Sequence, residues 1–243
     1  MADQQMHDVA VVGLGPTGAT LANLLGLCGL SVLVLERETG IYDLPRAVQF
    51  DDEVMRVFQT IGLAQDIKTT TRVNVGMRFV DPDGKLLLDW PRPTEVTPQG
   101  WHASYRFHQP DLERTLRKGL DRFARVEVKT GTEVLAIKDR GSHVDLEFEP
   151  KDGGDKQAAS ARYVVGCDGA RSTVRRSIGR ELFGDAANQA WGVMDVLAVT
   201  DFPDIRFKAV VHSNQGGNLL VIPREGGYLV RLYIELDELQ EHE

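Results

Sequence analysis

The feature that most constrains this chain is a glycine-rich turn that joins a short apolar strand to a helix near the start. Residues 13–18 have the sequence GLGPTG, which is the spacing G-x-G-x-x-G. Apolar runs over residues 7–12 and 31–36 predict two buried strands, and the apolar spacing within residues 16–29 predicts a helix between them. Such a β-α-β unit has parallel strands. The sequence therefore predicts an α/β fold.

This turn has the composition of a dinucleotide-binding site. Gly13 permits a tight turn, Gly15 lets a pyrophosphate approach the backbone, and Gly18 lets the helix pack closely on the strand. The helix start adds free N–H donors and the positive end of the helix dipole. Glu36 stands 18 residues after Gly18, at the end of the second strand, where its carboxylate can accept hydrogen bonds from a ribose. The alternative is a glycine-rich turn in an unrelated α/β protein. The expected phosphate-contacting residues are Gly13, Gly15, Pro16, Thr17 and Gly18.

A second motif follows a buried strand predicted over residues 163–167. Residues 167–175 have the sequence CDGARSTVR, so Asp168 and Gly169 stand directly after the strand. Open α/β sheets bind ligands outside the carboxyl ends of their strands, which places Asp168 at the same edge as the glycine turn. Alone, Asp168-Gly169 is typical of a simple turn. With the first motif, it indicates a nucleotide site.

The order of motifs resembles the group A flavoprotein monooxygenases, the aromatic-ring hydroxylases of the para-hydroxybenzoate hydroxylase type. That family combines the glycine motif, a strand-ending Glu, an Arg soon after, an R-x-x-Q-x-x-L-E helix start and a C/A-D-G-x-x-S-x-x-R segment. Here the corresponding segments are Glu36-Arg37, residues 45–47 (PRA), residues 106–113 (RFHQPDLE) and the Asp168 motif. The resemblance runs from residue 7 to about residue 235.

Two shorter segments resemble particular members of that family. Residues 50–53 (FDDE), before a helix ending at residues 61–63, are similar to 3-(3-hydroxyphenyl)propionate hydroxylase. Residues 222–228 (IPREGGY) are more similar to phenol 2-monooxygenase and 3-hydroxybenzoate hydroxylase. Asp51 and Asp52 are paired carboxylates, for which a solvated helix start is the alternative to a tuned base.

The resemblance implies FAD as the cofactor and assigns residues to it. The glycine turn would hold the pyrophosphate, and Glu36, followed by Arg37, would hold the adenosine ribose. Arg46 and Gln109 would lie on the flavin side. Asp168 and Gly169 would lie at the ribose-pyrophosphate region or the nicotinamide path. Three alternatives stay open: Arg46 as a surface arginine, Gln109 as a helix cap, and Arg106 as a partner of Glu113.

The remaining pattern predicts two interleaved domains. Residues 1–72 and 101–185 are assigned to a Rossmann-like FAD-binding domain, and residues 73–100 and 186–243 to a mainly antiparallel substrate-domain sheet. The elements expected beyond the β-α-β unit comprise helices over residues 52–61 and 110–123, and strands over 77–80, 86–90, 125–129, 133–138, 143–149, 163–167, 192–199, 207–213, 218–223 and 228–235.

The family resemblance implies an enzyme that uses NADPH or NADH and O2 to hydroxylate a phenolic compound through a flavin C4a-hydroperoxide. No side chain is assigned a catalytic role, because the cofactor supplies the reactive atoms. Two other functions stay open: an FAD-binding remnant without hydroxylase activity, and an NAD-binding dehydrogenase or reductase. The substrate, the choice of NADH or NADPH, and the oligomeric state are also open, with a homodimer as one option.

Composition excludes several other classes. The formal net charge is -8, which argues against a nucleic-acid partner. No apolar run approaches the roughly 18 residues that cross a membrane. Residues 1–8 lack a signal-peptide pattern. His102 and His108 share no metal-ligand spacing with other candidate ligands, so no metal is expected. Cys28 and Cys167 stand in apolar contexts, which favours buried free thiols and a cytoplasmic location.

One expected motif has no match. The family carries a Gly-Asp-Ala segment after the substrate sheet, and residues 184–187 (GDAA) have these letters but stand before the β-rich stretch. We interpret them as a chance match in a loop. The FAD-binding and substrate domains are therefore both expected to be incomplete, as in a chain truncated at its C-terminus.

Overall fold

The computed structural model describes residues 6–42, 47–185, 189–202, 205, 207–224 and 229–236. The chain forms two units. Unit 1 comprises Met1–Pro45, Phe58–Ile67 and Gln109–Phe183, and unit 2 comprises Arg46–Val57, Lys68–His108 and Gly184–Glu243. These bounds differ from the predicted domains around residues 46–57, 68–72 and 101–108. The assignment of FAD and substrate roles to the two parts stays a prediction.

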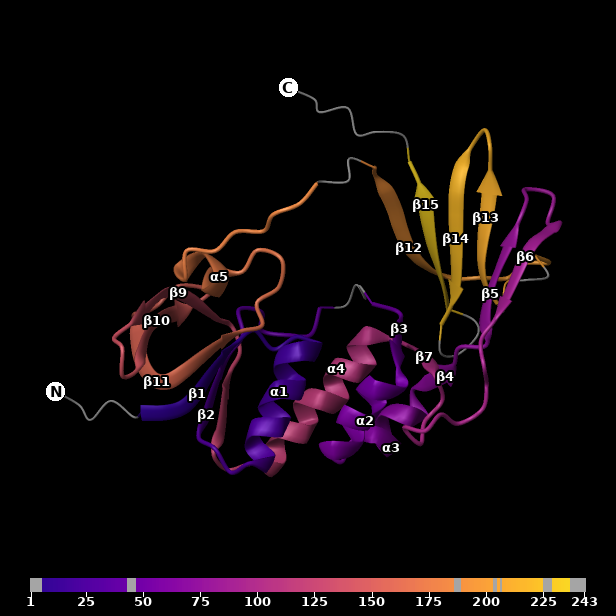
Figure 1. The fold of residues 1–243 in the computed structure, drawn as a ribbon. Coiled ribbons are helices and arrows are strands. Elements are labelled where there is room, and N and C mark those ends of the chain that lie inside the picture. Colours follow the sequence, from indigo (N-terminus) through magenta and orange to yellow (C-terminus); the bar gives the residue numbers. More distant parts are fainter. Residues whose placement is uncertain are drawn as a thin grey trace, which may run out of the picture. The chain divides into compact units, whose positions relative to one another are not determined.

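Unit 1 contains a six-stranded sheet in the order β8-β2-β1-β11-β10-β9 (Figure 1). β1 is parallel to both β2 and β11, and β2 is parallel to β8. β10 is antiparallel to β9 and β11. The first β-α-β unit is therefore parallel, as predicted. The strands are β1 (Met6–Val12), β2 (Val32–Leu35), β8 (Val126–Lys129), β9 (Thr132–Asp139), β10 (Val144–Pro150) and β11 (Gln157–Gly166).

Two helices of unit 1, α1 and α4, lie side by side (Figure 1). The buried Asn23 joins them, because its amide nitrogen donates to the carbonyl oxygens of Ala19 at 2.8 Å and Leu116 at 2.9 Å. α2 and α3 each cross a boundary between the units. The helices are α1 (Pro16–Leu27), α2 (Asp52–Thr60), α3 (Ala64–Thr69), α4 (Gln109–Lys118), the 3-10 turn η1 (Gly119–Arg122) and α5 (Thr173–Ser177).

The predicted burial of the two cysteines is wrong for Cys28 at the end of α1. Cys28 is exposed, and Cys167 is only partly buried. The residues that face the interior are small ones, because a helix that starts so close to the sheet leaves no room for large side chains there. They are Gly18, Ala19, Ala22 and Asn23. In α2, Val54 and Val57 are exposed, whereas Met55 is fully buried.

The core of unit 1 explains why β1 and β2 are continuous apolar runs. Ala10, Val12, Leu33 and Leu35 pack in one cluster with Val174 of α5 and with side chains of β9, β10 and β11. The alternate residues of the two strands are buried as well. Strands covered on both faces have apolar side chains at every position.

Unit 2 contains a second six-stranded sheet, in the order β12-β15-β14-β13-β5-β6, and a three-stranded sheet, β3-β7-β4. All neighbours are antiparallel except β13 and β5. Ala209, Val221 and Val230 form its core cluster. The strands are β3 (Gln49–Asp51), β4 (Thr71–Val73), β5 (Gly76–Val80), β6 (Leu86–Pro91), β7 (Ser104–Phe107), β12 (Trp191–Leu197), β13 (Lys208–Ser213), β14 (Gly217–Pro223) and β15 (Leu229–Glu235).

The predicted fold class, a parallel β-α-β domain interleaved with a mainly antiparallel sheet, is confirmed. The elements that the sequence pattern missed are all short. β3, β4 and β7 have three or four residues each, and α3 has six. Segments this short carry too few positions for a periodic pattern.

Candidate functional site

The glycine turn after β1 is fixed by its backbone. Gly13 has φ +100°, which only glycine adopts readily. A Cβ at this position would stand 2.4 Å from the carbonyl oxygen of Cys167, and a Cβ on Gly18 would stand 2.0 Å from the carbonyl oxygen of Gly13. The Gly13 N–H also donates to Leu35 O at 2.8 Å. Both glycines are therefore required by the close approach of three backbone segments.

The first turn of α1, in contrast to Gly13 and Gly18, has open space beside its backbone. Gly15 is the N-cap residue and supplies no side-chain cap, and Pro16 is the first helical residue. No atom lies within 4 Å of the position that a Gly15 Cβ would occupy, and Thr17 is exposed. The first-turn N–H groups of a helix have no partner within the helix. The loop thus presents backbone donors to open space, where an anion can bind.

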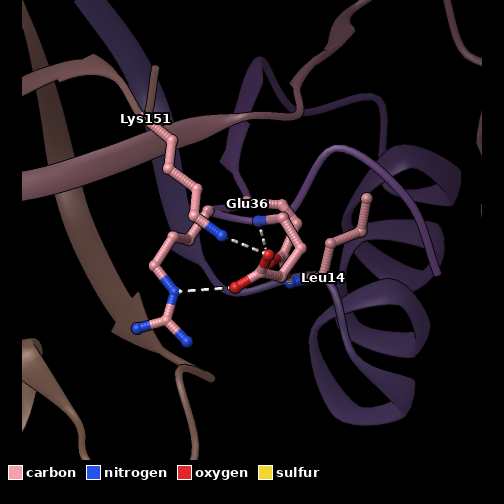
Figure 2. Close-up of polar contacts among 5 residues, drawn as sticks. Leu14, Glu36 and Lys151 are labelled. Carbon is pink, nitrogen blue, oxygen red and sulfur yellow. Dashed lines mark hydrogen bonds and ion pairs between the residues drawn. The ribbon is translucent and has the colours of Figure 1, made fainter. Parts of the chain in front are cut away.

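Glu36 closes this loop from the end of β2. Its Oε2 accepts from the Leu14 N–H at 2.6 Å, and its Oε1 accepts from the Glu38 N–H at 2.8 Å (Figure 2). Each carboxylate oxygen has a further lone pair. Glu36 therefore holds the glycine loop against β2 and retains acceptor capacity for hydroxyl groups.

Arg37 points its guanidinium at a neighbouring carboxylate. Its Nε donates to Glu38 Oε1 at 3.1 Å, and 60% of its side chain is exposed. Lys151 also donates to Glu38, and this hydrogen bond is the main cause that lowers the pKa of Glu38 (Figure 2). No local sequence pattern indicates the contact between Lys151 and Glu38, because the two residues are 113 positions apart.

Asp168 is bound by its own loop. Its Oδ1 accepts from Ser172 Oγ at 2.5 Å, and its Oδ2 accepts from the N–H groups of Thr173 at 2.6 Å and Val174 at 3.2 Å. Gly169 has φ +74°, which the turn requires. Burial, and secondly the Asp168 charge, raise the pKa of the Cys167 thiol. Asp168 thus caps α5 and fixes the segment that faces the glycine turn.

The structure brings the two motifs together at one sheet edge. β1 and β11 are paired, with Val12 opposite Gly166, and Cys167 N–H donates to Val12 O at 2.7 Å. Glu36 follows β2, the other neighbour of β1. The glycine turn, the Glu36 carboxylate and the Asp168 loop therefore meet at the carboxyl ends of three adjacent parallel strands.

Gln109 starts α4 and contacts its own helix. Its Nε2 donates to Glu113 Oε1 at 2.9 Å, and Arg117 Nη2 donates to Glu113 Oε2 at 3.2 Å. Glu113 is therefore held by Arg117, and not by Arg106 as one of the alternatives had it. Arg106 donates through Nη1 to Pro223 O at 3.3 Å. Arg46 lies outside the described residues, so its predicted position stays a prediction.

Unit 2 contains a buried charge network that the sequence analysis missed. Arg231 donates through Nε and Nη2 to the two oxygens of Asp195, each at 2.8 Å, and through Nη1 to Tyr233 Oη at 3.3 Å. Arg224, whose side chain is fully buried, lies 4.0 Å from the same carboxylate. Burial raises the pKa of Asp195, but the Arg231 hydrogen bonds and charge outweigh it and leave the pKa lowered.

Asp51 and Asp52 have separate structural contacts within unit 2. Asp51 Oδ1 accepts from the Val54 N–H at 3.0 Å, which is a helix-capping contact. Asp52 Oδ2 accepts from Thr97 Oγ1 at 2.6 Å. These contacts favour the helix-start interpretation over a base tuned by its neighbour.

Within the part of the chain that the structure describes, no helix has both the length and the apolar character needed to cross a membrane. In the same residues, no group of three or more His, Cys, Asp or Glu side chains is arranged to hold a metal ion.

Comparison with known protein families gives one match that spans the chain. Residues 6–243 match the family described as FAD binding domain. Among curated proteins, the 3-hydroxybenzoate 4-monooxygenase of Comamonas testosteroni is 41% identical over 97% of this chain and 39% of its own length. A probable NADH-specific resorcinol 4-hydroxylase of Rhodococcus jostii is 40% identical over 84% of this chain and 38% of its own length.

A third relative and a solved structure agree with the family match. A 3-(3-hydroxy-phenyl)propionate/3-hydroxycinnamic acid hydroxylase of Burkholderia vietnamiensis is 43% identical over 77% of this chain and 34% of its own length. The fold matches p-nitrophenol 4-monooxygenase PnpA of Pseudomonas putida with a TM-score of 0.86 at 24% identity, covering 98% of this chain and 60% of that one. The chain spans about two fifths of the length of the curated relatives it matches.

Proposed function

The chain belongs to the FAD binding domain family, and from that premise we propose that the protein is an FAD-dependent monooxygenase that uses NADH or NADPH to hydroxylate a phenolic compound. Three relatives with 40–43% identity are named as hydroxylases or monooxygenases of phenolic compounds, which supports this activity. The name of the resorcinol hydroxylase specifies NADH, which favours NADH as the reductant here. The family match does not favour an NAD-binding dehydrogenase.

The geometry of the glycine turn carries this proposal. Gly13 and Gly18 leave no room for a Cβ, whereas the space beside Gly15 is open, so the turn forms a backbone cradle that fits a pyrophosphate. Glu36 lies beside the cradle with spare acceptor capacity for the hydroxyl groups of a ribose. We assign the FAD pyrophosphate to residues 13–18 and its ribose to Glu36.

The other predicted cofactor residues are weaker assignments. Asp168 and Gly169 would act by holding the loop that faces the cradle, because the Asp168 oxygens already accept three hydrogen bonds. Arg37 would contribute charge near the ribose from an exposed position. Gln109 and Arg46 stay proposals for the flavin side. When bound, FAD supplies the redox and oxygen chemistry, and these residues bind and orient it.

The experiment is a cofactor and turnover assay on the purified protein. We expect a yellow protein whose visible spectrum bleaches on anaerobic addition of NADH, and phenol-dependent NADH oxidation with hydroxylated product formed in equal amount. Oxidation that yields only hydrogen peroxide with every phenol tried would contradict the hydroxylase assignment. A purified protein that holds no FAD would instead favour the alternative function, an FAD-binding remnant without hydroxylase activity.

Substitution within the cradle tests the cofactor assignment separately. Gly15→Asp places a carboxylate where the pyrophosphate would lie, and the open space leaves the fold intact. We expect this variant to lose FAD while keeping the circular dichroism spectrum of the parent. Gly40→Asp, at another unobstructed glycine of unit 1, is the control and should retain FAD.

We also propose a homodimer in the cytoplasm. β6 is an edge strand with every residue exposed, including Leu86 at 52%, Leu88 at 53% and Trp90 at 59%. Apolar edge strands tend to pair with another chain. Light scattering should give twice the monomer mass, and Leu88→Lys should lower it. A monomeric parent would contradict the dimer, and cell fractionation tests the location.

A further inference from the structure

Arg106, in the middle of the three-stranded sheet of unit 2, is a buried cation with weak pairing. Only 9% of the residue is exposed. Its Nη1 reaches the neutral carbonyl oxygen of Pro223 at 3.3 Å, and its Nε is buried without a hydrogen-bond partner in the described part of the chain. Burial lowers its pKa, and no described carboxylate offsets this. A buried guanidinium is costly unless an anion pairs with it.

A second cation lies beside it. Lys208 begins β13, is partly buried, and donates to Gln49 Oε1 at 3.3 Å. Gln49 is the register partner of Arg106 across β3 and β7. Pro223, which accepts from Arg106, ends β14, the neighbour of β13, and Ala209 is paired with Val221. Gln49 therefore connects the two cations, because it accepts from Lys208 and is paired with Arg106 in the sheet. The paired strands β13 and β14 give a second connection, because Lys208 begins β13 and Pro223, which accepts from Arg106, ends β14.

The charges around these cations do not balance among the described residues. Burial lowers the pKa of Lys208, and the charges of Arg92 and Arg106 lower it further. The hydrogen bonds of the pair go to neutral oxygens, at Pro223 and Gln49. Arg231 in the same unit has Asp195 as a bidentate partner. The Arg106–Lys208 pair thus has the charge and the spare donors that a single carboxylate would satisfy.

We propose that Arg106 and Lys208 form a carboxylate subsite that selects phenols bearing a carboxylate over neutral phenols. A guanidinium and an ammonium together bind a carboxylate through charge-assisted hydrogen bonds. This inference rests on the proposed function, because it names the substrate class of the same enzyme. It also divides the relatives, since 3-hydroxybenzoate and 3-(3-hydroxyphenyl)propionate carry a carboxylate, and resorcinol does not.

The test compares two ligands that differ only in charge. 3-Hydroxybenzoate and 3-hydroxybenzamide share the ring and the hydroxyl group, and calorimetric titration of the purified protein measures binding of each without turnover. We expect a preference for the acid of at least about tenfold, the value of one or two charge-assisted hydrogen bonds. Arg106→Met and Lys208→Met should each reduce that preference about tenfold or abolish it, while affinity for the amide stays unchanged.

Lys85→Met removes the same charge from an exposed turn of unit 2 and should leave the preference intact. If Arg106→Met does not fold, the Lys208→Met result decides alone, because Lys208 is less buried. An equal affinity of the parent for acid and amide, or a preference that survives in a folded variant, overturns the subsite. Failure of the proposed function is a separate outcome, namely that no phenol, charged or neutral, is hydroxylated.

Discussion

The carboxylates at the loop ends of unit 1 and the charged network of unit 2 are satisfied in different ways. In unit 1, the carboxylates of Glu36 and Asp168 accept hydrogen bonds mainly from backbone N–H groups of nearby loops. In unit 2, Asp195 is held by the side chain of Arg231, and the cations outnumber the carboxylates around Arg106 and Lys208. The proposed cofactor site of unit 1 is therefore built from backbone, and the proposed carboxylate subsite of unit 2 is built from charged side chains.

This difference predicts which substitutions each kind of site tolerates. A backbone cradle depends on residues that have no side chain, so any added atom disrupts it. A charge network depends on pairs of long side chains, so it fails when one partner is removed. Substitutions that add an atom should therefore damage unit 1 most, and substitutions that remove a charge should damage unit 2 most.

The largest effect is expected from Gly13→Ala. The positive φ and a Cβ placed 2.4 Å from Cys167 O together should lower the free energy of unfolding by about 4 kcal/mol and abolish FAD binding. Gly29→Ala is the matched control, since Gly29 has φ +72° and no atom within 4 Å of the added Cβ, and should cost about 1 kcal/mol. Urea unfolding measures both. Equal costs would show that the contact with Cys167 does not matter.

The next effect is expected from Asp195→Asn in unit 2. Loss of the carboxylate leaves the buried guanidinium of Arg231 uncompensated, which should cost about 3 kcal/mol. All three tryptophans lie in unit 2, so tryptophan fluorescence during urea unfolding reports this unit. Asp89→Asn weakens a partly exposed ion pair with Arg78 in the same unit and serves as the control without measurable change. A parent-like fluorescence midpoint for Asp195→Asn would contradict the network.

A smaller effect is expected from Asp168→Asn in unit 1. The amide keeps the shape but weakens the acceptor for Thr173 and Val174, which should cost about 1.5 kcal/mol. Both cysteines lie in unit 1, and Cys167 is adjacent, so the labelling rate of its thiol measures local opening. Asp152→Asn, in an exposed turn, should leave the rate unchanged. Unchanged Cys167 labelling in Asp168→Asn would mean that the loop is held by other contacts.

The smallest effect is a difference in acid sensitivity between the units. Burial lowers the pKa of His7 from its ordinary 6.5, so its contribution to stability is present above pH 6.5 and is lost as the pH falls through the folded-state pKa. The lowered pKa of Asp195 places the corresponding loss in unit 2 below its ordinary 3.8. Between these values, circular dichroism should report weakening before tryptophan fluorescence does.

His7→Gln should remove the early change in circular dichroism, and the partly exposed His143→Gln should not. Coincident changes in circular dichroism and tryptophan fluorescence at every pH would contradict the assignment of the two pH ranges to separate units.

The same contrast explains what the sequence could predict. The glycine turn and the Asp168 segment are contiguous motifs, and the alternation of apolar residues located almost every strand of five or more residues. Asp195 and Arg231 are 36 positions apart, and Lys208 and Gln49 are 159 positions apart. No local pattern connects such pairs, because the sheets that bring them together are formed by residues distant in the chain.

Burial was less predictable than secondary structure. The apolar spacing within residues 16–29 predicted α1, but the approach of α1 to the glycine turn required the small residues Gly18 and Ala19 at the contact. The spacing of apolar residues predicts which face of a helix is apolar. It does not predict how closely that face packs on the neighbouring strand. Most strand bounds were close to the predicted ones, but β11 begins at Gln157, six residues before the predicted start at residue 163, because its first half is not a continuous apolar run.

The contact between Gly13 and Cys167 has a consequence for how the protein is made. The two residues are 154 positions apart, and β1 lacks its neighbour β11 until the later segment emerges from the ribosome. At a synthesis rate of roughly 5–20 residues per second, that interval is roughly 8 to 30 seconds. During it, the nascent chain carries the apolar strand β1 with one edge uncovered, together with the first segments of unit 2. The glycine turn is thus translated well before the segment that fixes it.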